Sequence, residues 1–263
     1  MFIVKIGGGK ELNLKGIISD LATLNQKFII VHGANTLRDE LAAKLNYQKK
    51  VVTSISGYDS VLSNEETIDL MMMAYAGLKN KRIVELCQQN GINAVGLSGL
   101  DGKVIQGKRN TGIKVREGGK TLLLRDFSGK PKAINKALIE LLLDNGYIPV
   151  LSVPLIDENN FAINSENDDI VALLQTELKT EKVISLIEAP GFLLDKNDPA
   201  SLVSKMSKAE LETMEEKVEG RMKRKILAIR KLFDGGNTTV IISDGRTEHP
   251  ILDALNGNGT IIL

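Results

Sequence analysis

Short apolar runs alternate along the chain with longer stretches in which apolar residues recur every three or four positions. The short runs, which are rich in valine and isoleucine, predict β-strands at residues 2–6, 27–32, 92–97, 147–152, 182–187, 238–243 and 259–263. The longer stretches predict amphipathic helices at residues 14–25, 36–45, 65–91, 132–146, 168–178 and 221–236. Alternating strands and helices are typical of an α/β fold with a mainly parallel sheet that is covered by helices on both faces.

Residues 101–132 interrupt this alternation. We expect them to form a β-hairpin excursion that turns at residues 117–119. The stretch contains nine lysine and arginine residues against three acidic ones, which leaves +6 in a chain whose total is +1. Two interpretations stay open: a solvated ribbon whose charged edges resist aggregation, or a surface that attracts an acidic partner.

The composition narrows the class of protein. At 263 residues the chain is long enough for one large domain or for two lobes with a full core. The net charge argues against general binding to nucleic acid. The single cysteine, Cys87, excludes an internal disulfide and a multi-cysteine zinc site. Because no apolar run approaches twenty residues and no signal peptide is visible, we expect a cytoplasmic protein that binds no membrane.

Two loops that follow predicted strands carry glycine directly after the strand. Lys5 lies inside the first apolar run, and three glycines follow at positions 7–9. Their spacing fits neither a P-loop nor a dinucleotide fingerprint. However, glycines let backbone N–H groups approach an anion, and a strand lysine supplies positive charge. In the second loop, Gly33 stands where the free amides of a helix start would hold phosphate or carboxylate. The adjacent His32 is predicted to be structural.

Two further segments carry charged or polar residues where a helix begins. Asn164 and Asp168 lie four residues apart at one such point, and helix capping together with the helix dipole explains them without a ligand. At the other, Lys223, Arg224 and Lys225 place cations where the macrodipole opposes them. That placement is favourable if a polyphosphate lies beside it. Ligands of open α/β sheets gather at the carboxyl ends of the strands, so we expect the four loops to converge on one site. A phosphate-binding site that combines glycine loops with lysines indicates a kinase.

These loops and their surroundings resemble the amino-acid kinase superfamily, in its N-acetylglutamate kinase branch. Within that branch the chain is most similar to the LysZ-type kinases, which act on aminoadipate or glutamate bound to an amino-group carrier protein. The resemblance runs nearly end to end, and it rests on the motifs VKIGG, VHGAN, GLSGLDG, GKRNTGIKV, AINSENDD, APGFLL, GRMKRK and SDGRTEHP.

The resemblance implies a three-layer α/β/α sandwich with an acyl-substrate lobe at residues 1–175 and an ATP lobe at residues 176–263. It implies that ATP phosphorylates the side-chain carboxylate of the carrier-linked aminoadipate or glutamate, giving an acyl phosphate in lysine or arginine biosynthesis. Mg²⁺ would be held mainly through the nucleotide, with no ligand from protein side chains expected. The resemblance also implies a homodimer. The basic stretch 101–132 then becomes the expected docking surface for a small acidic carrier, with a patch at Lys108, Arg109, Lys114 and Arg116.

The resemblance also implies roles for individual residues at positions that match the family's motifs. The expected catalytic residues are Lys5, Asp168 and Lys225, with Asp168 holding the two lysines that flank the transferring phosphoryl group. The expected substrate-binding residues are Gly7, Gly8, Gly33, Ala34, Asn35, Val61 and Asn164. The expected ATP-binding residues are Lys5, Gly7, Gly8, Glu188, Gly191, Met222 and Lys225.

Several positions depart from the family pattern. Val61 stands where the family has an arginine that grips the substrate's α-carboxylate, and Asp169 and Glu188 replace the glutamine and the aspartate or asparagine of two other motifs. A guanidinium binds a carboxylate through two parallel hydrogen bonds, so its loss argues against N-acetylglutamate as the substrate. Two alternatives stay open. One is a kinase for a free metabolite such as N-acetylglutamate or N-acetylaminoadipate, and the other is a diverged ATP-binding regulatory protein.

Overall fold

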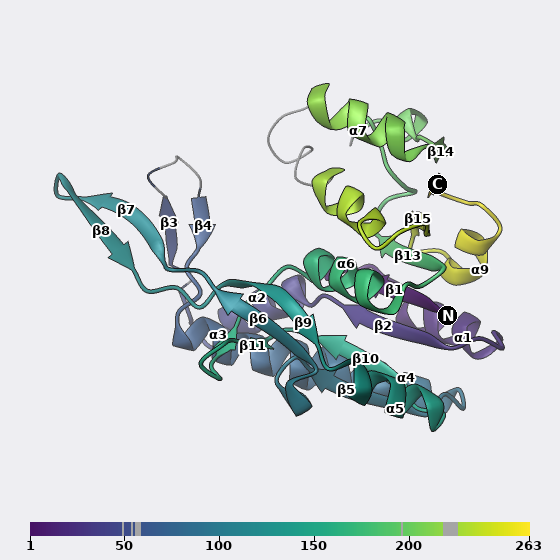
Figure 1. Ribbon diagram of the computed structural model, residues 1–263, viewed down its shortest axis with the longest axis horizontal. Helices are drawn as coiled ribbons and strands as arrows, with labels where there is room; N and C mark the ends of the chain where they lie inside the picture. The colour runs from purple at the N-terminus through teal and green to yellow at the C-terminus, as the bar shows by residue number, and fades with distance from the viewer. Residues whose placement is uncertain (49, 54, 56–58, 196, 218–225) are drawn as a thin grey trace.

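The structure is a computed structural model, which describes residues 1–263 except 49, 54, 56–58, 196 and 218–225. Within the described residues, eight strands form one central sheet in the order β14, β16, β15, β13, β1, β2, β10 and β5 (Figure 1). Neighbouring strands are parallel except β15 and β16, so the predicted mainly parallel sheet is confirmed. The strands are β1 (Phe2–Ile6), β2 (Phe28–His32), β5 (Ala94–Ser98), β10 (Ile148–Ser152), β13 (Lys182–Ile187), β14 (Lys205–Met206), β15 (Thr239–Asp244) and β16 (Thr260–Ile262).

Both faces of the central sheet are buried, because successive side chains of each strand point to opposite sides. In β1, for example, Ile3 belongs to one apolar core and Val4 to the other. Helices α5 and α6 close the first core, and helices α1, α4 and α9 close the second. The predicted α/β/α sandwich is therefore confirmed. The helices are α1 (Leu14–Ala22), α4 (Asn80–Gln89), α5 (Lys136–Asp144), α6 (Asn167–Leu178) and α9 (Pro250–Leu255).

The basic stretch 101–132 is more structured than one hairpin. Its two ends, β6 and β9, pair in a second sheet of the described residues, in the order β12, β11, β6 and β9. Between them the hairpin of β7 and β8 reaches away from the body of the molecule (Figure 1). The hairpin turns at Gly118 and Gly119, whose positive φ angles of 57° and 78° suit glycine. These strands are β6 (Ile105–Arg109), β7 (Ile113–Glu117), β8 (Lys120–Leu124), β9 (Gly129–Ile134), β11 (Leu155–Ile156) and β12 (Ala162–Ile163).

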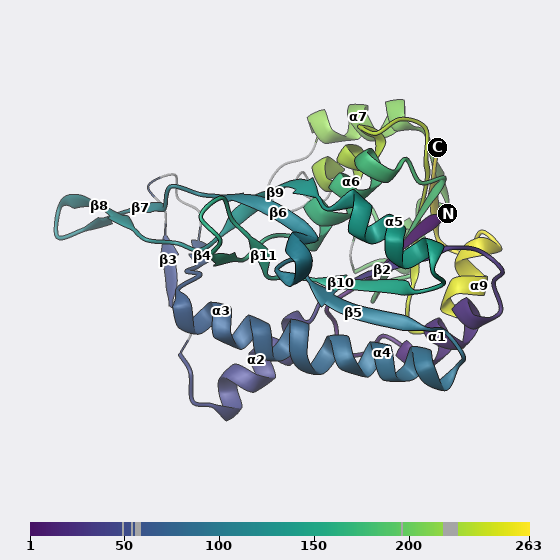
Figure 2. The same ribbon diagram turned by 60° about the horizontal axis from the view of Figure 1, so that its bottom comes forward.

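The long helix predicted at residues 65–91 consists of three segments that follow one another as a continuous rod beside β5 and β10 (Figure 2). The middle segment is a π-helix, in which the N–H of Asn80 donates to the carbonyl of Tyr75. Such wider turns are frequent at functional sites, and the local pattern of apolar residues did not reveal this one. The first two segments are α3 (Glu65–Met71) and η1 (Met72–Lys79), and the third is α4.

The remaining elements lie around this framework. They are α2 (Asn35–Lys44), β3 (Val51–Thr53), β4 (Asp59–Val61), the short 3-10 turns η2 (Asp101–Lys103), η3 (Pro199–Ser201) and η4 (Lys231–Phe233), α7 (Lys208–Lys217), and a helical segment at residues 226–230. No helix in the described parts of the chain is long and apolar enough to cross a membrane. The predicted lobe boundary at residues 175 and 176 falls inside α6 and stays a prediction.

Candidate functional site

Lys5 forms an ion pair with Asp168 at the carboxyl end of the central sheet. The lysine is on β1, between β2 and β13, and its side chain is only 16% exposed. Its Nζ lies 2.5 Å from Oδ1 of Asp168, which belongs to the first turn of α6. A mostly buried ammonium needs a partner that offsets its desolvation, and an acidic residue in the first turn of a helix is itself stabilised by the helix dipole. The structure therefore brings together these two predicted catalytic residues.

The loops after β1 and β2 contact each other through their glycines. The N–H of Gly33 donates to the carbonyl of Ile6 at 2.8 Å, and the N–H of Gly7 donates to the carbonyl of Leu186 at 3.0 Å. A Cβ atom on Gly8 would lie 2.8 Å from the backbone nitrogen of Asn35, which is closer than real side chains come. The glycines thus have a packing reason that sequence reasoning missed, because it appears only when two distant loops meet.

The same loop leaves donors available for an anion. Within the described part of the chain, the N–H groups of Gly8 and Gly9 make no hydrogen bond. Glu188, at the end of β13, accepts a hydrogen bond from the N–H of Glu11 at 2.7 Å, and its carboxylate occupies the space where a Cβ on Gly9 would be. The glycine loop is therefore held from one side by a carboxylate while two of its amides stay unpaired.

A cavity of about 430 Å³ opens beside the Lys5–Asp168 pair. Its apolar wall comes from β13, from the loop after it, and from the helical segment 226–230, so it offers both a charged end and an apolar slot. The lining residues include Lys5, Asp168, Ser185, Glu188, Gly191, Phe192, Ala228 and Ile229. The glycine loop itself lines a second cavity of about 420 Å³, whose residues include Gly8, Gly9, Lys10, Ala34 and Lys79.

The predicted substrate residues occupy the neighbouring region. Asn164 donates from Nδ2 to Oγ of Ser63 at 3.2 Å, and its backbone N–H donates to the carbonyl of Phe127 at 2.7 Å. The side-chain oxygen of Asn35 accepts a short hydrogen bond from the hydroxyl of Tyr75. Burial raises the pKa of Tyr75 to about 12, so the phenol stays protonated. Tyr75 was missed by sequence reasoning, because nothing local distinguishes it from a core aromatic residue.

Three predicted residues cannot be placed in this site. Met222 and Lys225 lie outside the described residues. Val61 ends β4, but its side chain is outside the described part of the structure. Their roles therefore stay predictions.

His32 is fully buried, and its contacts are those of a structural residue, not of a group that transfers protons. Its Nε2 lies 3.2 Å from Nδ2 of Asn80, which also donates to the carbonyl of Val150. Burial lowers the pKa of His32 to about 3, so the imidazole stays neutral near pH 7. The histidine packs β2 against the start of α4, in agreement with the structural role predicted for it.

The predicted docking patch divides into two kinds of residue. Lys108, Lys114 and Arg116 are exposed, and the register of β7 with β8 puts the last two on one face of the hairpin. Arg109 differs. Its Nε lies 3.6 Å from the fully buried carboxylate of Asp157, and its guanidinium lies over the rings of Phe127 and Phe161, at 5.3 and 5.7 Å from their centres. We therefore remove Arg109 from the expected docking surface, because its charge is already engaged inside the protein.

The chain belongs to the amino acid kinase family, whose model matches residues 1–244. It is similar to LysW-aminoadipate kinase from Thermus thermophilus, with 39% identity over 268 residues and 100% of both chains covered. It is also similar to acetylglutamate kinase from Archaeoglobus fulgidus, with 31% identity, 99% of this chain covered and 92% of the relative. The predicted family, its branch and an ATP-dependent kinase are thereby confirmed.

A solved structure supports the fold. Carbamate kinase from Giardia lamblia, bound to AMP-PNP, matches with a TM-score of 0.68 and 17% identity, with 100% of this chain and 97% of that chain covered. At this level of identity the likeness shows the shared fold alone.

Proposed function

We propose that this kinase transfers the γ-phosphoryl group of ATP to the side-chain carboxylate of aminoadipate or glutamate attached to a small acidic carrier protein, as a step of lysine or arginine biosynthesis. The observation that carries the proposal is the Lys5–Asp168 pair, 2.5 Å apart, which lines a cavity together with Glu188, the residue that holds the glycine loop and its two unpaired amides. The Thermus relative, which is named for LysW-aminoadipate, supports the choice of acceptor.

Phosphoryl transfer to a carboxylate requires charge neutralisation more than it requires a general base. A carboxylate oxygen of the acceptor attacks the γ-phosphorus, the bond to the β–γ bridging oxygen breaks, and ADP leaves with that electron pair. Since the attacking carboxylate carries no proton, no general base is required. Lys5 would neutralise charge on the transferring group, the amides of Gly8 and Gly9 would donate to its oxygens, and Asp168 would hold Lys5 in place.

ATP fits the cavity beside Lys5 in size and character. A nucleotide needs an apolar slot for its base and donors for its phosphates, and the cavity of about 430 Å³ provides Phe192 and Ile229 for the first and Lys5 for the second. We assign Glu188 and Gly191 to the nucleotide side on the same grounds, and Gly7, Gly8, Met222 and Lys225 on the family resemblance of the sequence. Mg²⁺ would enter with the nucleotide's phosphates.

The acidic carrier would bind Lys114 and Arg116 on the projecting hairpin and Lys108 on the neighbouring strand β6. The exposed Leu123 lies opposite Lys114, so this face of the hairpin combines positive charge with one apolar contact. On the other face of the hairpin, Val115 packs against Val52 and Leu62. Charges on such a projecting surface steer an oppositely charged partner.

The second candidate is a kinase for a free acyl amino acid. The acetylglutamate kinase relative at 31% identity favours it, whereas Val61 in place of the carboxylate-binding arginine argues against it. We also propose that the enzyme works as a homodimer in the cytoplasm, as the resemblance implies, and light scattering of the purified chain would test the dimer.

The deciding experiment compares acceptors. Purified enzyme with Mg-ATP is offered either carrier-linked aminoadipate or glutamate, or free N-acetylglutamate, and the acyl phosphate is trapped with hydroxylamine. We expect efficient phosphorylation of a carrier-linked substrate only. The variant Lys108→Glu/Lys114→Glu/Arg116→Glu should lower kcat/KM for the carrier at least about tenfold and leave KM for ATP unchanged. Lys208→Glu, which reverses an exposed charge on α7, is the control. Efficient use of free N-acetylglutamate would replace the first candidate with the second.

A further inference from the structure

Asp169 holds two lysines that come from opposite sides of the site. Its carboxylate is only 10% exposed, and both of its oxygens are occupied. Oδ2 accepts from Nζ of Lys130 on β9 at 2.6 Å, and Oδ1 accepts from Nζ of Lys231 on η4 at 2.6 Å. We call this group of three residues the Asp169 clamp. Asp169 directly follows Asp168 in the first turn of α6, so that turn bonds three separate elements: β1, β9 and η4.

One arm of the clamp reaches the acyl-substrate side. Lys130 follows Gly129, whose N–H donates to the carbonyl of Asn164 at 2.8 Å, and Asn164 was predicted to bind the substrate. Fixing Lys130 on Asp169 therefore fixes the strand against which Asn164 is aligned.

The other arm reaches the nucleotide side. Lys231 directly follows the helical segment 226–230, which contributes Ala228 and Ile229 to the wall of the cavity beside Lys5. The same region packs tightly on α6, because a Cβ on Gly235 would lie 2.6 Å from Cα of Thr176. Arg230, in the same segment, also forms an ion pair with Glu215 on α7, with its Nη1 at 3.2 Å from Oε2. In the sequence, Lys225 directly precedes this segment.

The charges of the clamp explain why an aspartate suits this position. Burial by itself raises the pKa of Asp169, but the hydrogen bonds and charges of Lys130 and Lys231 outweigh it and keep the pKa below its usual value. A neutral glutamine, which the resemblance places here, would leave the two ammonium groups facing each other without a negative charge between them. The half-exposed lysines make any gain in stability small. The clamp therefore contributes to the relative placement of β9 and η4 more than to the stability of the protein.

We propose that Asp169 is a positioning residue, which rests on the function proposed above: through Lys130 and Lys231 it sets the separation between the acyl-substrate side and the nucleotide side. Phosphoryl transfer depends steeply on this separation, because a misplacement of about 1 Å lowers the rate roughly a hundredfold. The residue touches neither reactant in this account and acts only through its two lysines.

The first test separates kcat from KM. In Asp169→Asn and Lys231→Met, kcat should fall about 10- to 100-fold, while KM for ATP and for the acyl acceptor changes less than about threefold. Lys231→Arg, which keeps the charge, should restore most of kcat. Lys27→Met removes a lysine of similar exposure to Lys231, whose partner Asp144, at 2.8 Å, is itself exposed, and it serves as the control. Unchanged kcat in both variants alongside a lower melting temperature would reduce the clamp to a structural ion pair. A selective rise in KM for ATP would instead make Lys231 a nucleotide-binding residue and overturn the proposal.

The second test does not depend on activity. Spin labels on Lys132→Cys in β9 and Glu212→Cys in α7, both exposed positions, report the separation of the two sides by pulsed electron resonance. Cys87 is fully buried and is not labelled in the folded protein. We expect one narrow distance distribution that shifts or broadens in Asp169→Asn. An unchanged distribution would overturn the proposal. If the wild type phosphorylates no acceptor, the function proposed above fails, and this measurement still decides whether the clamp sets the separation.

Discussion

A lysine in the middle of an apolar strand is the residue on which the site depends. Lys5 has buried neighbours on both sides along β1, and its ammonium is stabilised by a carboxylate from a helix that begins far away in the sequence. Removing either partner leaves the other charge half-buried and unpaired, which destabilises the local geometry as well as the chemistry.

We expect Lys5→Ala to lower kcat by roughly 10²–10³, because one preorganised charge that acts on the transition state contributes about that factor. Asp168→Asn should have a similar effect, since it releases Lys5. Steady-state kinetics measures the loss, and thermal melting shows that the fold persists. Lys15→Ala, at an exposed position on α1, should keep full activity. Full activity in Lys5→Ala would contradict the assignment of the site.

His32 makes the free energy of unfolding decrease as the pH falls below its usual pKa. An unfolded histidine titrates near 6.5, and burial lowers the pKa of His32 to about 3 in the folded protein. The unfolded chain therefore binds the proton first as the pH falls. The contribution of His32 to stability is fully present above about pH 6.5, and it is lost toward pH 3 at about 1.4 kcal/mol per pH unit.

Urea unfolding at pH 7.5, 6.0 and 5.0 measures this dependence. His32→Gln should have a shallower loss of unfolding free energy between pH 6.0 and 5.0 than the wild type. His249→Gln is the matched control, because the chain has only these two histidines and the hydrogen bond to Asp20 raises the pKa of His249. The contribution of His249 is present below about pH 6.5 and disappears as the pH rises through its folded pKa. Equal acid slopes for His32→Gln and the wild type would show that His32 is not the group responsible.

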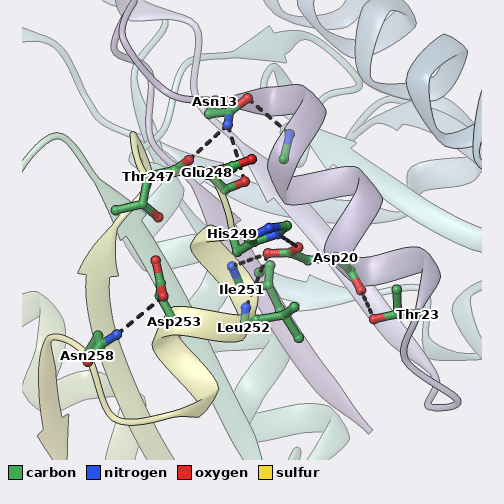
Figure 3. Close-up of polar contacts among 11 residues, drawn as sticks. Asn13, Asp20, Thr23, Thr247, Glu248, His249, Ile251, Leu252, Asp253 and Asn258 are labelled. Carbon is green, nitrogen blue, oxygen red and sulfur yellow. Dashed lines mark hydrogen bonds and ion pairs between the residues drawn. The ribbon is translucent and has the colours of Figure 1, made fainter.

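At the scale of elements, the first and last helices of the chain are joined by one buried side chain (Figure 3). Helix α9 begins with Pro250 and has no cap from its own sequence. Asp20 on α1 supplies it, because its Oδ2 accepts from the N–H groups of Ile251 and Leu252 at 3.0 and 3.2 Å, and its Oδ1 lies 2.9 Å from Nδ1 of His249. Free amides of a first helical turn are thereby satisfied from another element.

We expect Asp20→Ala to lower the free energy of unfolding by about 1–3 kcal/mol, since it leaves buried N–H groups without an acceptor. Asp20→Asn keeps one acceptor oxygen and should lose less. Denaturant unfolding gives both values. Asp144→Ala removes an exposed aspartate whose ion pair within the described residues is with Lys27, and it should change stability by less than about 1 kcal/mol. A loss in Asp20→Ala no larger than in Asp144→Ala would show that the cap does not stabilise the junction.

At the scale of the whole molecule, the two ends of the chain meet in one sheet. β1 lies between β2 and β13, so Lys5 from the N-terminal region and the loop after β13 from the C-terminal region line the same cavity. A ligand held by both sides binds only the folded state. Its binding free energy is therefore added to the stability of the entire fold.

We expect Mg-ATP to raise the melting temperature in a concentration-dependent way. At a hundredfold excess over Kd the stabilisation amounts to about 2.7 kcal/mol. Differential scanning calorimetry measures the shift. Adenosine, which lacks the phosphates, should stabilise much less, and Lys5→Ala should have a smaller shift with Mg-ATP than the wild type. Equal shifts for adenosine and Mg-ATP would contradict phosphate binding at the glycine loop.

The sequence by itself determined the framework of the protein. The residues of a strand or helix that are buried recur with a local period, so strands β1, β2, β5, β10, β13, β15 and β16 and the α/β class follow from apolar patterns alone. The predicted positions of Lys5 and Asp168 came from motifs that the family resemblance made interpretable, and the structure places the two residues together.

Only the tertiary structure decided how charged residues pair. Asp169 departed from a family motif in the sequence, but its two lysines come from β9 and η4, and no local pattern connects them. Arg109 looked like an exposed member of a basic surface until the fold brought Asp157 and Phe161 against it. Burial periodicity depends on near neighbours in the chain, whereas an ion pair depends on atoms a few ångströms apart in space. That distance is known only after the chain has folded.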